Sequence, residues 1–216
     1  MIRELSTNDF WILAHGVKWT LLLSMIAFIG GGLVGMLIAL MRTATARLPR
    51  VTAYLYIELF QGTPMLLQLF VVYYGLALMG LDLNVWIAAS IGLTAHASAF
   101  LGEIWRGGIQ AVPKGQVEAA RALGMGYWSR MYDVVLPQAF KVSLPATVGF
   151  LVGLIKGTSL VSIVGFVELT RSGQIISNNT FQPLLVFGIV AAIYFCICFP
   201  LSWLSEKLEA RIAAAS

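Results

Sequence analysis

The sequence predicts an all-α protein that crosses a membrane about five times. Of its 216 residues, 59% are hydrophobic and only 11% are charged, whereas soluble domains carry about 25% charged residues. The apolar residues gather in runs of about 20 or more, the length that a helix needs to cross the hydrocarbon core. The runs do not alternate polar and apolar residues as barrel strands do. Helices are therefore the structure that satisfies their backbone within lipid.

Five runs meet this length and end at charged or turn-forming residues. They cover residues 17–41, 54–79, 85–109, 144–166 and 184–204. We expect residues 17–212 to form one transmembrane domain, followed by a short tail, 213–216. Residues 1–16 are expected to form a separate external segment, with Phe10, Trp11 and Leu13 at the membrane interface.

Basic residues predict the orientation of the spans, because cytoplasmic connections carry an excess of Lys and Arg. The first and third connections and the C-terminal tail contain Arg42, Arg47, Arg50, Arg106, Lys114, Arg121, Arg130, Lys141, Lys207 and Arg211. The second connection has no basic residue and the fourth has only Arg171. This asymmetry places the N-terminus outside and the C-terminus in the cytoplasm.

The net charge of +4 follows from this topology. No basic face with interleaved aromatic residues suggests nucleic-acid binding. Cys196 and Cys198 lie two residues apart in the last span and face different directions on a helix, so neither a disulfide nor a metal site is expected.

A polar loop of about residues 112–138 interrupts the apolar pattern. Pro113 suits a helix start, and Gly124 suits a left-handed turn that ends the first helix. A second short helix is expected after Gly124, with Pro137 ending it or starting the next span. The two helices would lie across the cytoplasmic surface. By itself the pattern fits an interfacial helix pair as well as a surface that docks a soluble partner.

The register of this loop carries a family resemblance. Glu118-Ala119-Ala120, Gly124, Val134 and Leu136-Pro137 follow the spacing EAA-x3-G-x9-[IV]-x-LP. It resembles the loop with which ABC importer permeases dock onto their ATPase subunit. The segments ELFQGTP (58–64), AFLGEIWRGGIQ (99–110) and KGTSLV (156–161) resemble stretches of the polar amino acid permeases in the same order, and the resemblance covers about residues 12–212. Gln61 stands where the family usually has Arg, and Gly157 where it usually has Asp. The second departure argues mildly against a basic amino acid as substrate.

The resemblance implies a function and its partners. It implies a permease subunit in the bacterial inner membrane that translocates a polar amino acid or similar small solute, delivered by an extracytoplasmic binding protein. Such permeases work with a second permease, identical or related, and with an ATPase dimer that binds ATP and Mg. This chain is expected to hold no cofactor and to be no enzyme; Gly30-Gly31-Gly32 lacks the G-K-[ST] of a phosphate-binding loop. The coupling residues that the resemblance assigns are Gly115, Glu118, Ala119, Ala120, Gly124, Leu136 and Pro137.

Polar residues inside the spans are functional candidates, because burying them in lipid is costly. The expected substrate-pathway residues are His96, Ser98, Lys156, Gly157, Thr158 and Ser159. His96 also fits a hydrogen-bonded structural role, and the hydroxyls of Thr158 and Ser159 also fit bonds to their own helix. Structural ion pairing is the expected role of Glu58, Glu103 and Arg106.

Two other classes of protein stay open on the residues alone. One is an ion-coupled secondary transporter, although the chain has no internal repeat of the kind that builds such transporters. The other is a membrane scaffold that recruits a partner without transporting a solute. A scaffold would need the loop but not the polar residues of the spans.

Overall fold

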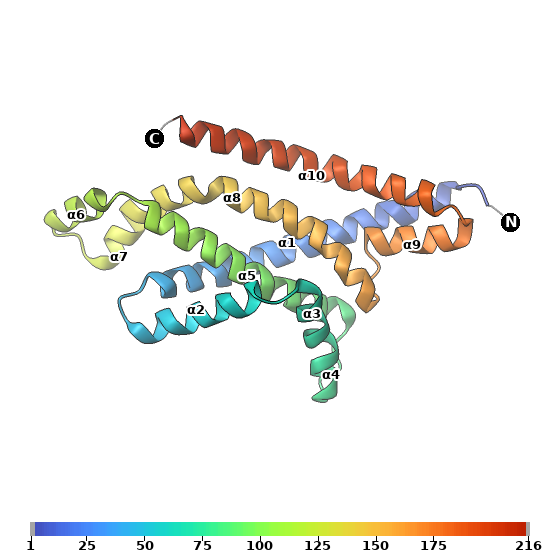
Figure 1. Cartoon of the computed structure of the whole chain (residues 1–216), viewed down its shortest axis with the longest axis horizontal. Helices are drawn as coiled ribbons and strands as arrows, with labels where there is room; N and C mark the ends of the chain where they lie inside the picture. Colours follow the sequence, from blue (N-terminus) through green and yellow to red (C-terminus); the bar gives the residue numbers. More distant parts are fainter. Residues whose placement is uncertain (1–2, 215–216) are drawn as a thin grey trace.

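The computed structural model describes residues 3–214, and this part of the chain folds into helices and connecting turns without a strand (Figure 1). The long helices are α1 (Thr7–Thr43), α5 (Val85–Ala111), α8 (Leu136–Gly157) and α10 (Pro183–Ala213). The shorter α-helices are α2 (Arg47–Gln61), α3 (Met65–Phe70), α4 (Leu76–Leu78), α6 (Lys114–Ala122), α7 (Tyr127–Arg130) and α9 (Leu169–Thr180). π-helical turns at Val71–Gly75 and Met131–Val135 and a 3₁₀ segment at Thr158–Val164 continue neighbouring helices.

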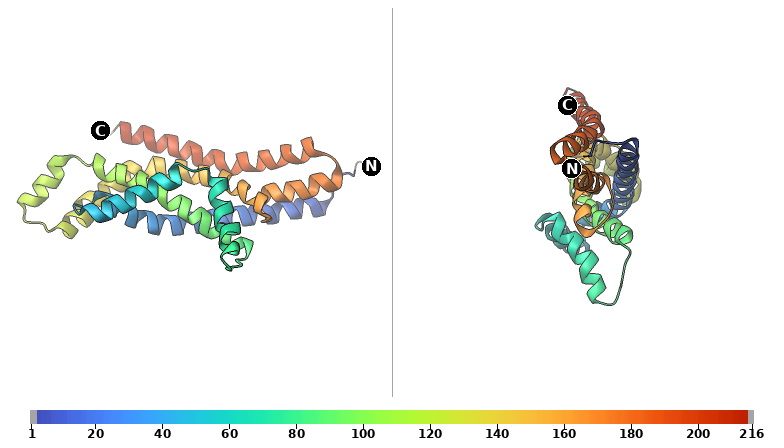
Figure 2. Two further views of the ribbon diagram at one scale, coloured as in Figure 1. Left: turned by 60° about the horizontal axis from the view of Figure 1, so that its bottom comes forward. Right: turned by 90° about the vertical axis from the view of Figure 1, so that its right-hand side faces the viewer.

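Four stretches are long and apolar enough to cross a membrane: Thr7–Thr43, Val85–Ala111, Tyr127–Val164 and Pro183–Ala213. The remaining predicted span, residues 54–79 and second along the chain, is not one straight helix. It is the pair α2 and α3–α4, bent by 104°. The bend follows from Gly62-Thr63-Pro64, because a proline disfavours the helical conformation of the residue before it. The end-on view shows α3 and α4 projecting to one side of the bundle (Figure 2).

The predicted N-terminal segment 1–16 is helical from Thr7 and continues into the first span without a break, and its external location stays a prediction. Residues 7–16 are the first turns of α1, which begins after Ser6 and is continuous to Thr43. The carboxylate of Asp9 accepts a hydrogen bond from the Ser6 backbone N–H at 2.8 Å, the arrangement that starts a capped helix. Phe10 and Trp11 are exposed as predicted for an interface, but Leu13 is buried against Leu169 and Ile176.

Two further differences concern the connections. The fourth connection contains a helix, α9, whose buried face includes Leu169 and Ile176. The second helix of the 112–138 loop is not a separate element, since Tyr127–Val164 forms one 38-residue stretch into the next span. Composition gave no sign of α9, because its buried face is set by packing against α1 and α10.

The bundle core forms where α1 lies along α5, with α8 beside them. A Cβ on Gly31 would lie only 2.5 Å from the Cβ of Ala97, and one on Gly35 would lie 3.0 Å from the carbonyl oxygen of Ser98. These glycines therefore let two backbones come into contact, as the Gly-x-x-x-Gly spacing predicts. Leu23, Leu93 and Leu154 fill the adjoining core.

The two ends of the long axis carry different segments (Figure 1). The α1–α2 turn, α6, α7 and the C-terminus gather at one end, which we call the loop end. The N-terminal residues and α9 lie at the other, which we call the α9 end. The three basic segments of the sequence thus share one end, as the charge asymmetry requires; which end faces the cytoplasm stays a prediction.

Candidate functional site

The loop at residues 112–138 presents one face inward and one outward. Val117, on the inner face of α6, packs against Val112 and Met131, and Ala120 is buried. Gly115, Glu118 and Ala119 are all exposed. The carboxylate of Glu118 forms no ion pair with any residue of 3–214. Of the coupling residues that the resemblance assigns to α6, Ala120 is therefore buried, and the other three are exposed on the outer side of the same helix.

Gly124 reverses the chain after α6. Its φ of 76° lies in the left-handed region, as predicted. The N–H of Gly124 bonds the carbonyl of Arg121 at 2.9 Å, and the N–H of Met125 bonds that of Ala120 at 3.1 Å. These two bonds cap the last carbonyls of the helix.

Pro137 does not end the second helix of the loop, in contrast to one of the two predicted roles. It lies in the first turn of α8, directly after the π-helical turn Met131–Val135. A proline has no N–H for the preceding turn and its ring crowds that turn, so a locally widened helix accommodates it. Leu136 packs on the cluster of Val135 and Ala139, while Pro137 is exposed.

Three large side chains of the same loop are exposed. Leu123, Trp128 and Tyr132 are 82%, 71% and 77% exposed. Together with Gly115, Glu118 and Ala119 we call them the loop surface. A surface that combines exposed aromatic residues with an unpaired carboxylate has the composition of a protein-binding site.

Of the predicted pathway residues, His96 keeps accessible surface in the middle of α5. Its Nδ1 lies 2.9 Å from Oε1 of Gln68 on α3, and its ring packs against Phe100 in a tilted arrangement, with 4.5 Å between centroids. Ser98, in contrast, is fully buried. Its hydroxyl donates to the Ala95 carbonyl at 2.8 Å and lies 2.8 Å from the Tyr56 hydroxyl of α2. Ser98 therefore ties α2 to α5 in this structure, and its predicted pathway role stays a prediction.

The four pathway candidates of the KGTS segment point in different directions. Lys156 is exposed, whereas Gly157 packs on Met65 of α3, whose Cε would be 3.0 Å from an added Cβ. Lys156 therefore does not share the environment of its neighbour Gly157. It forms no ion pair within residues 3–214.

The hydroxyls of this segment bond to their own helix. Thr158 is fully buried and donates to the Ile155 carbonyl at 2.7 Å, and Ser159 donates to the Lys156 carbonyl at 2.7 Å. In this conformation the Thr158 hydroxyl is enclosed and bonded within its own helix, the second of the two predicted roles; its pathway role stays a prediction. The helix does loosen here, into the 3₁₀ segment Thr158–Val164.

The predicted ionic residues divide into a pair and a single residue. Arg106 holds Glu103 through two bonds, of 2.8 Å from Nε and 2.5 Å from an Nη. Glu58 is exposed and pairs with no cation of residues 3–214, so the pairing predicted for it is not formed. It lies on the surface of α2 opposite the buried Ala53 and Ile57.

The sequence analysis missed a buried carboxylate, Glu168, just before α9. Its oxygens accept bonds from the backbone N–H groups of Thr170 and Arg171, both at 2.9 Å, and from the hydroxyls of Tyr194 at 2.9 Å and Thr20 at 3.3 Å. Burial raises the pKa of this carboxyl, and the hydrogen bonds oppose that shift. Its position as a helix N-cap could have identified it from the sequence. Because α9 was not predicted, this position was not recognised.

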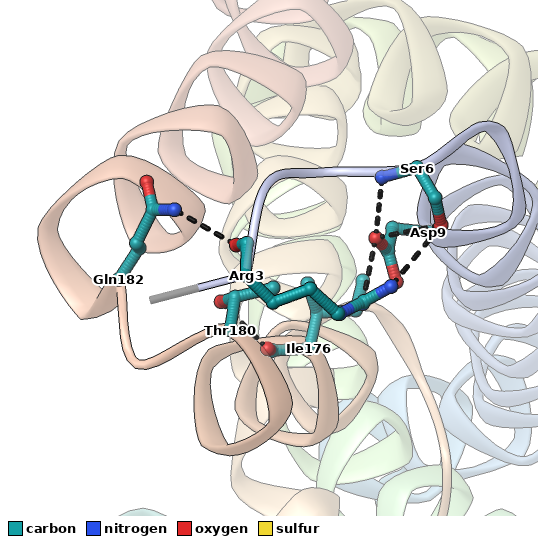
Figure 3. A network of polar contacts seen from close by, with 6 residues as sticks. All are labelled: Arg3, Ser6, Asp9, Ile176, Thr180 and Gln182. Carbon is teal, nitrogen blue, oxygen red and sulfur yellow. Dashed lines mark hydrogen bonds and ion pairs between the residues drawn. The ribbon is translucent and has the colours of Figure 1, made fainter. Parts of the chain in front are cut away.

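A second polar cluster at the α9 end was also missed (Figure 3). The guanidinium of Arg3 holds both carboxylate oxygens of Asp9, at 2.7 and 2.8 Å. The backbone N–H of Arg3 donates to the Thr180 carbonyl at 3.2 Å, and the Gln182 amide donates to the Arg3 carbonyl at 2.9 Å. The N-terminal residues are thereby tied to the turn between α9 and α10.

Comparison with known proteins identifies the family. Residues 17–214 match the model of the binding-protein-dependent transport system inner membrane component. The chain is 34% identical to the probable amino-acid ABC transporter permease protein YckA of Bacillus subtilis, with 97% of this chain and 93% of that protein covered. It is 36% identical to the L-cystine transport system permease protein TcyB of the same species, with 97% and 90% covered.

A solved structure agrees with these matches. The crystal structure of an amino acid ABC transporter with histidines superposes with a TM-score of 0.86 at 36% identity, covering 97% of this chain and 100% of that one. The geometry of the bundle and the sequence matches lead to the same assignment: this chain belongs to the family of binding-protein-dependent transport system inner membrane components, and it is a multi-pass protein of the inner membrane.

Proposed function

We propose that this chain is the permease subunit of an ATP-driven importer for a polar amino acid or a similar small solute. The observation that carries the proposal is the loop surface, which has the register of an ATPase-docking loop and stays exposed in the single chain. Relatives of matching length are named as amino-acid, L-cystine and glutamine permeases, which supports the substrate class. ATP and Mg are bound by the ATPase dimer, and the solute arrives on an extracytoplasmic binding protein.

The second permease completes the pathway in this proposal. Lys156 lies within a candidate span, is exposed and has no ion-pair partner within residues 3–214. An ammonium group facing hydrocarbon costs about 2.5–3.5 kcal/mol on insertion scales. Its face of α8 is therefore covered by the second permease or lines a water-filled route. His96 of α5, which keeps accessible surface, is a second lining residue of the solute route in this proposal.

The loop mediates the coupling. ATP binding moves the ATPase subunits, and the loop transmits this movement to the spans that it joins, α5 and α8. Glu118 offers its free carboxylate to a basic residue of the ATPase, while Gly115 and Ala119 allow close approach of that surface. Because α7 and α8 are continuous within Tyr127–Val164, a push on the loop reaches the span directly.

A charge reversal at each end tests the proposal. The tagged chain is purified from its native membrane in mild detergent, and its partners are identified and counted by mass spectrometry. We expect the wild type and Glu4→Lys, at the α9 end, to recover an ABC ATPase, and Glu118→Lys to recover at least tenfold less. Equal recovery with Glu118→Lys would contradict docking through this loop. A wild-type chain that recovers no ATPase would favour a secondary transporter.

Uptake then tests the substrate class. The purified assembly is placed in lipid vesicles with its binding protein, and ATP-dependent uptake of labelled polar amino acids is measured. Uptake of at least one of them is expected. If the ATPase is recovered but no amino acid is taken up, the assignment as an ABC importer subunit would stand and the proposed solute class would be rejected.

A further inference from the structure

The break between α2 and α3 exposes backbone carbonyls in the middle of a membrane span. In a helix the carbonyl of Phe60 would accept from the residue four positions later, which is Pro64 and has no N–H. Unsatisfied backbone groups are costly in lipid. A hollow of about 200 Å³ also lies beside the bend, lined by Phe60, Thr63 and Gln68 among others, so packing alone does not hold the two helices at their angle.

Gln68 replaces the missing donor. Its side-chain nitrogen lies 2.7 Å from the Phe60 carbonyl oxygen, 3.0 Å from the Thr63 carbonyl oxygen and 2.9 Å from the Thr63 hydroxyl. The two preceding carbonyls also have donors: Gly62 N–H bonds Glu58 at 2.8 Å, and the Thr63 hydroxyl bonds Leu59 at 2.7 Å. Gln68 is 9% exposed and completes this series.

The same side chain determines the protonation pattern of His96. Backbone carbonyls only accept, so the end of the Gln68 amide that faces Phe60 and Thr63 is its NH₂ group. Its oxygen is then the atom 2.9 Å from His96 Nδ1. An amide oxygen needs a donor, so Nδ1 carries the hydrogen, and in the neutral ring Nε2 is left as an acceptor.

Nε2 is the free polar atom of this cluster. It has no hydrogen-bond partner within residues 3–214, and the imidazole keeps accessible surface. Phe100 and Phe150 hold the ring, with centroids at 4.5 and 6.4 Å. The ring is thus fixed on one side by Gln68 and packed on its faces, while its second nitrogen is available to a ligand.

We propose that Gln68 is a positioning residue for transport: it closes the break in the second span and holds His96 with Nε2 as an acceptor for the ammonium group of the solute. The inference rests on the proposed function for the identity of the solute. The bend of α2 against α3 and the acceptor on α5 are then set by one side chain, so a movement of the broken span also moves the solute contact.

The first test observes the imidazole directly and needs no transport. The chain contains two histidines, and His15→Gln removes the other one. In ¹³C,¹⁵N-histidine-labelled protein in lipid vesicles, solid-state NMR distinguishes protonated from unprotonated ring nitrogens. We expect protonated Nδ1 and unprotonated Nε2, and loss of this single pattern in Gln68→Met. Protonated Nε2 with bare Nδ1 in the Gln68-containing protein would overturn the proposal.

The second test separates the two nitrogens by uptake kinetics in the reconstituted assembly. His96→Asn keeps an amide donor near Nδ1 but places nothing at Nε2, so KM should rise about tenfold with kcat little changed, the loss of one hydrogen bond to a charged group. His96→Gln reaches the Nε2 position with its amide oxygen and should restore part of the affinity. Gln68→Met, which also loses the bonds across the break, should lower kcat as well.

A matched control distinguishes failure of this inference from failure of the proposed function. His15→Asn changes an exposed histidine at the α9 end and should leave KM unchanged. Wild-type uptake with an unchanged KM in His96→Asn would overturn the solute contact alone. Absence of amino acid uptake by the wild type would reject the proposed function and the ammonium contact together, while the NMR pattern would still decide the positioning role.

Discussion

The α9 end and the loop end treat their polar groups in opposite ways. At the α9 end, Glu168 and Asp9 are 0% and 3% exposed, and each has several donors from within the chain. At the loop end, Glu118 is exposed and has no ion pair within residues 3–214, and Trp128 and Tyr132 of the same loop are exposed. The two buried carboxylates of the first end are satisfied within one chain. The exposed groups of the second end are those that the proposed function assigns to the ATPase contact.

The difference separates residues that stabilise the fold from residues that contact partners. Satisfied buried carboxylates join three segments that are distant in sequence: α1, the start of α9 and α10 meet at Glu168 through Thr20 and Tyr194. Substitutions there should be measured by unfolding. Substitutions on the loop surface should change association and leave unfolding almost unchanged.

The largest effect on stability is expected for Glu168→Ala. It leaves two backbone N–H groups and the hydroxyls of Thr20 and Tyr194 without their acceptor. Each buried unsatisfied group costs about 1–3 kcal/mol. Since neighbouring groups relax, we expect a total loss of about 3 kcal/mol, measured by thermal unfolding in mild detergent. Glu4→Ala, an exposed carboxylate at the same end, is the control. An unchanged midpoint for Glu168→Ala would mean that this end is not held by its network.

The next effect concerns the turn of the loop. Gly124 has φ 76°, and Gly126 has φ −63°; nothing lies within 4 Å of an added Cβ at either position. Gly124→Ala should therefore cost about 1–2 kcal/mol through backbone strain alone, and Gly126→Ala should cost much less. Amide hydrogen exchange over residues 114–135 measures this loss as faster exchange in the first variant. Equal exchange in the two variants would show that the left-handed turn does not limit the order of the loop.

The sequence was sufficient for features that depend on local pattern. Apolar runs located the long spans, and the turn at Gly124 followed from the residue type. The Gly31-x-x-x-Gly35 spacing is likewise typical of close helix packing, which the structure shows between α1 and α5. Each depends on neighbours within a few residues or on one repeated spacing.

Features that depend on distant contacts were not predictable in the same way. Glu168 is buried only because Thr20 and Tyr194 approach it from other helices. The role of Ser98 depends on Tyr56 across the α2–α5 contact. Lys156 and Gly157 are adjacent in sequence, yet Lys156 is exposed and Gly157 packs on Met65 of α3. A list of polar residues in spans therefore identifies candidates but does not tell which of them share a surface.

A smaller effect is expected from the ionisation of Glu168, which lies between the spans. Burial raises its pKa above the ordinary 4.5, so the folded protein disfavours the charged form. The contribution to stability is therefore full below the unfolded pKa and falls as pH rises through the raised folded value. Glu168→Gln cannot ionise, so the difference in midpoint between wild type and this variant should shift against the wild type with rising pH. A pH-independent difference would contradict the raised pKa.

The smallest effect on stability, and a large one on association, is expected at the loop surface. Trp128→Ser with Tyr132→Ser removes side chains that are 71% and 77% exposed, and exposed substitutions usually change stability by less than about 0.5 kcal/mol. Trp11→Ser at the α9 end, 66% exposed, is the matched control. Both proteins should unfold like the wild type, but only the loop variant should lose the ATPase in the purification assay. If the loop variant unfolded at a lower temperature than the wild type, Trp128 and Tyr132 would stabilise the fold, as the buried groups of the α9 end do. If both variants kept the ATPase, partner contact would lie elsewhere than on these exposed aromatic residues.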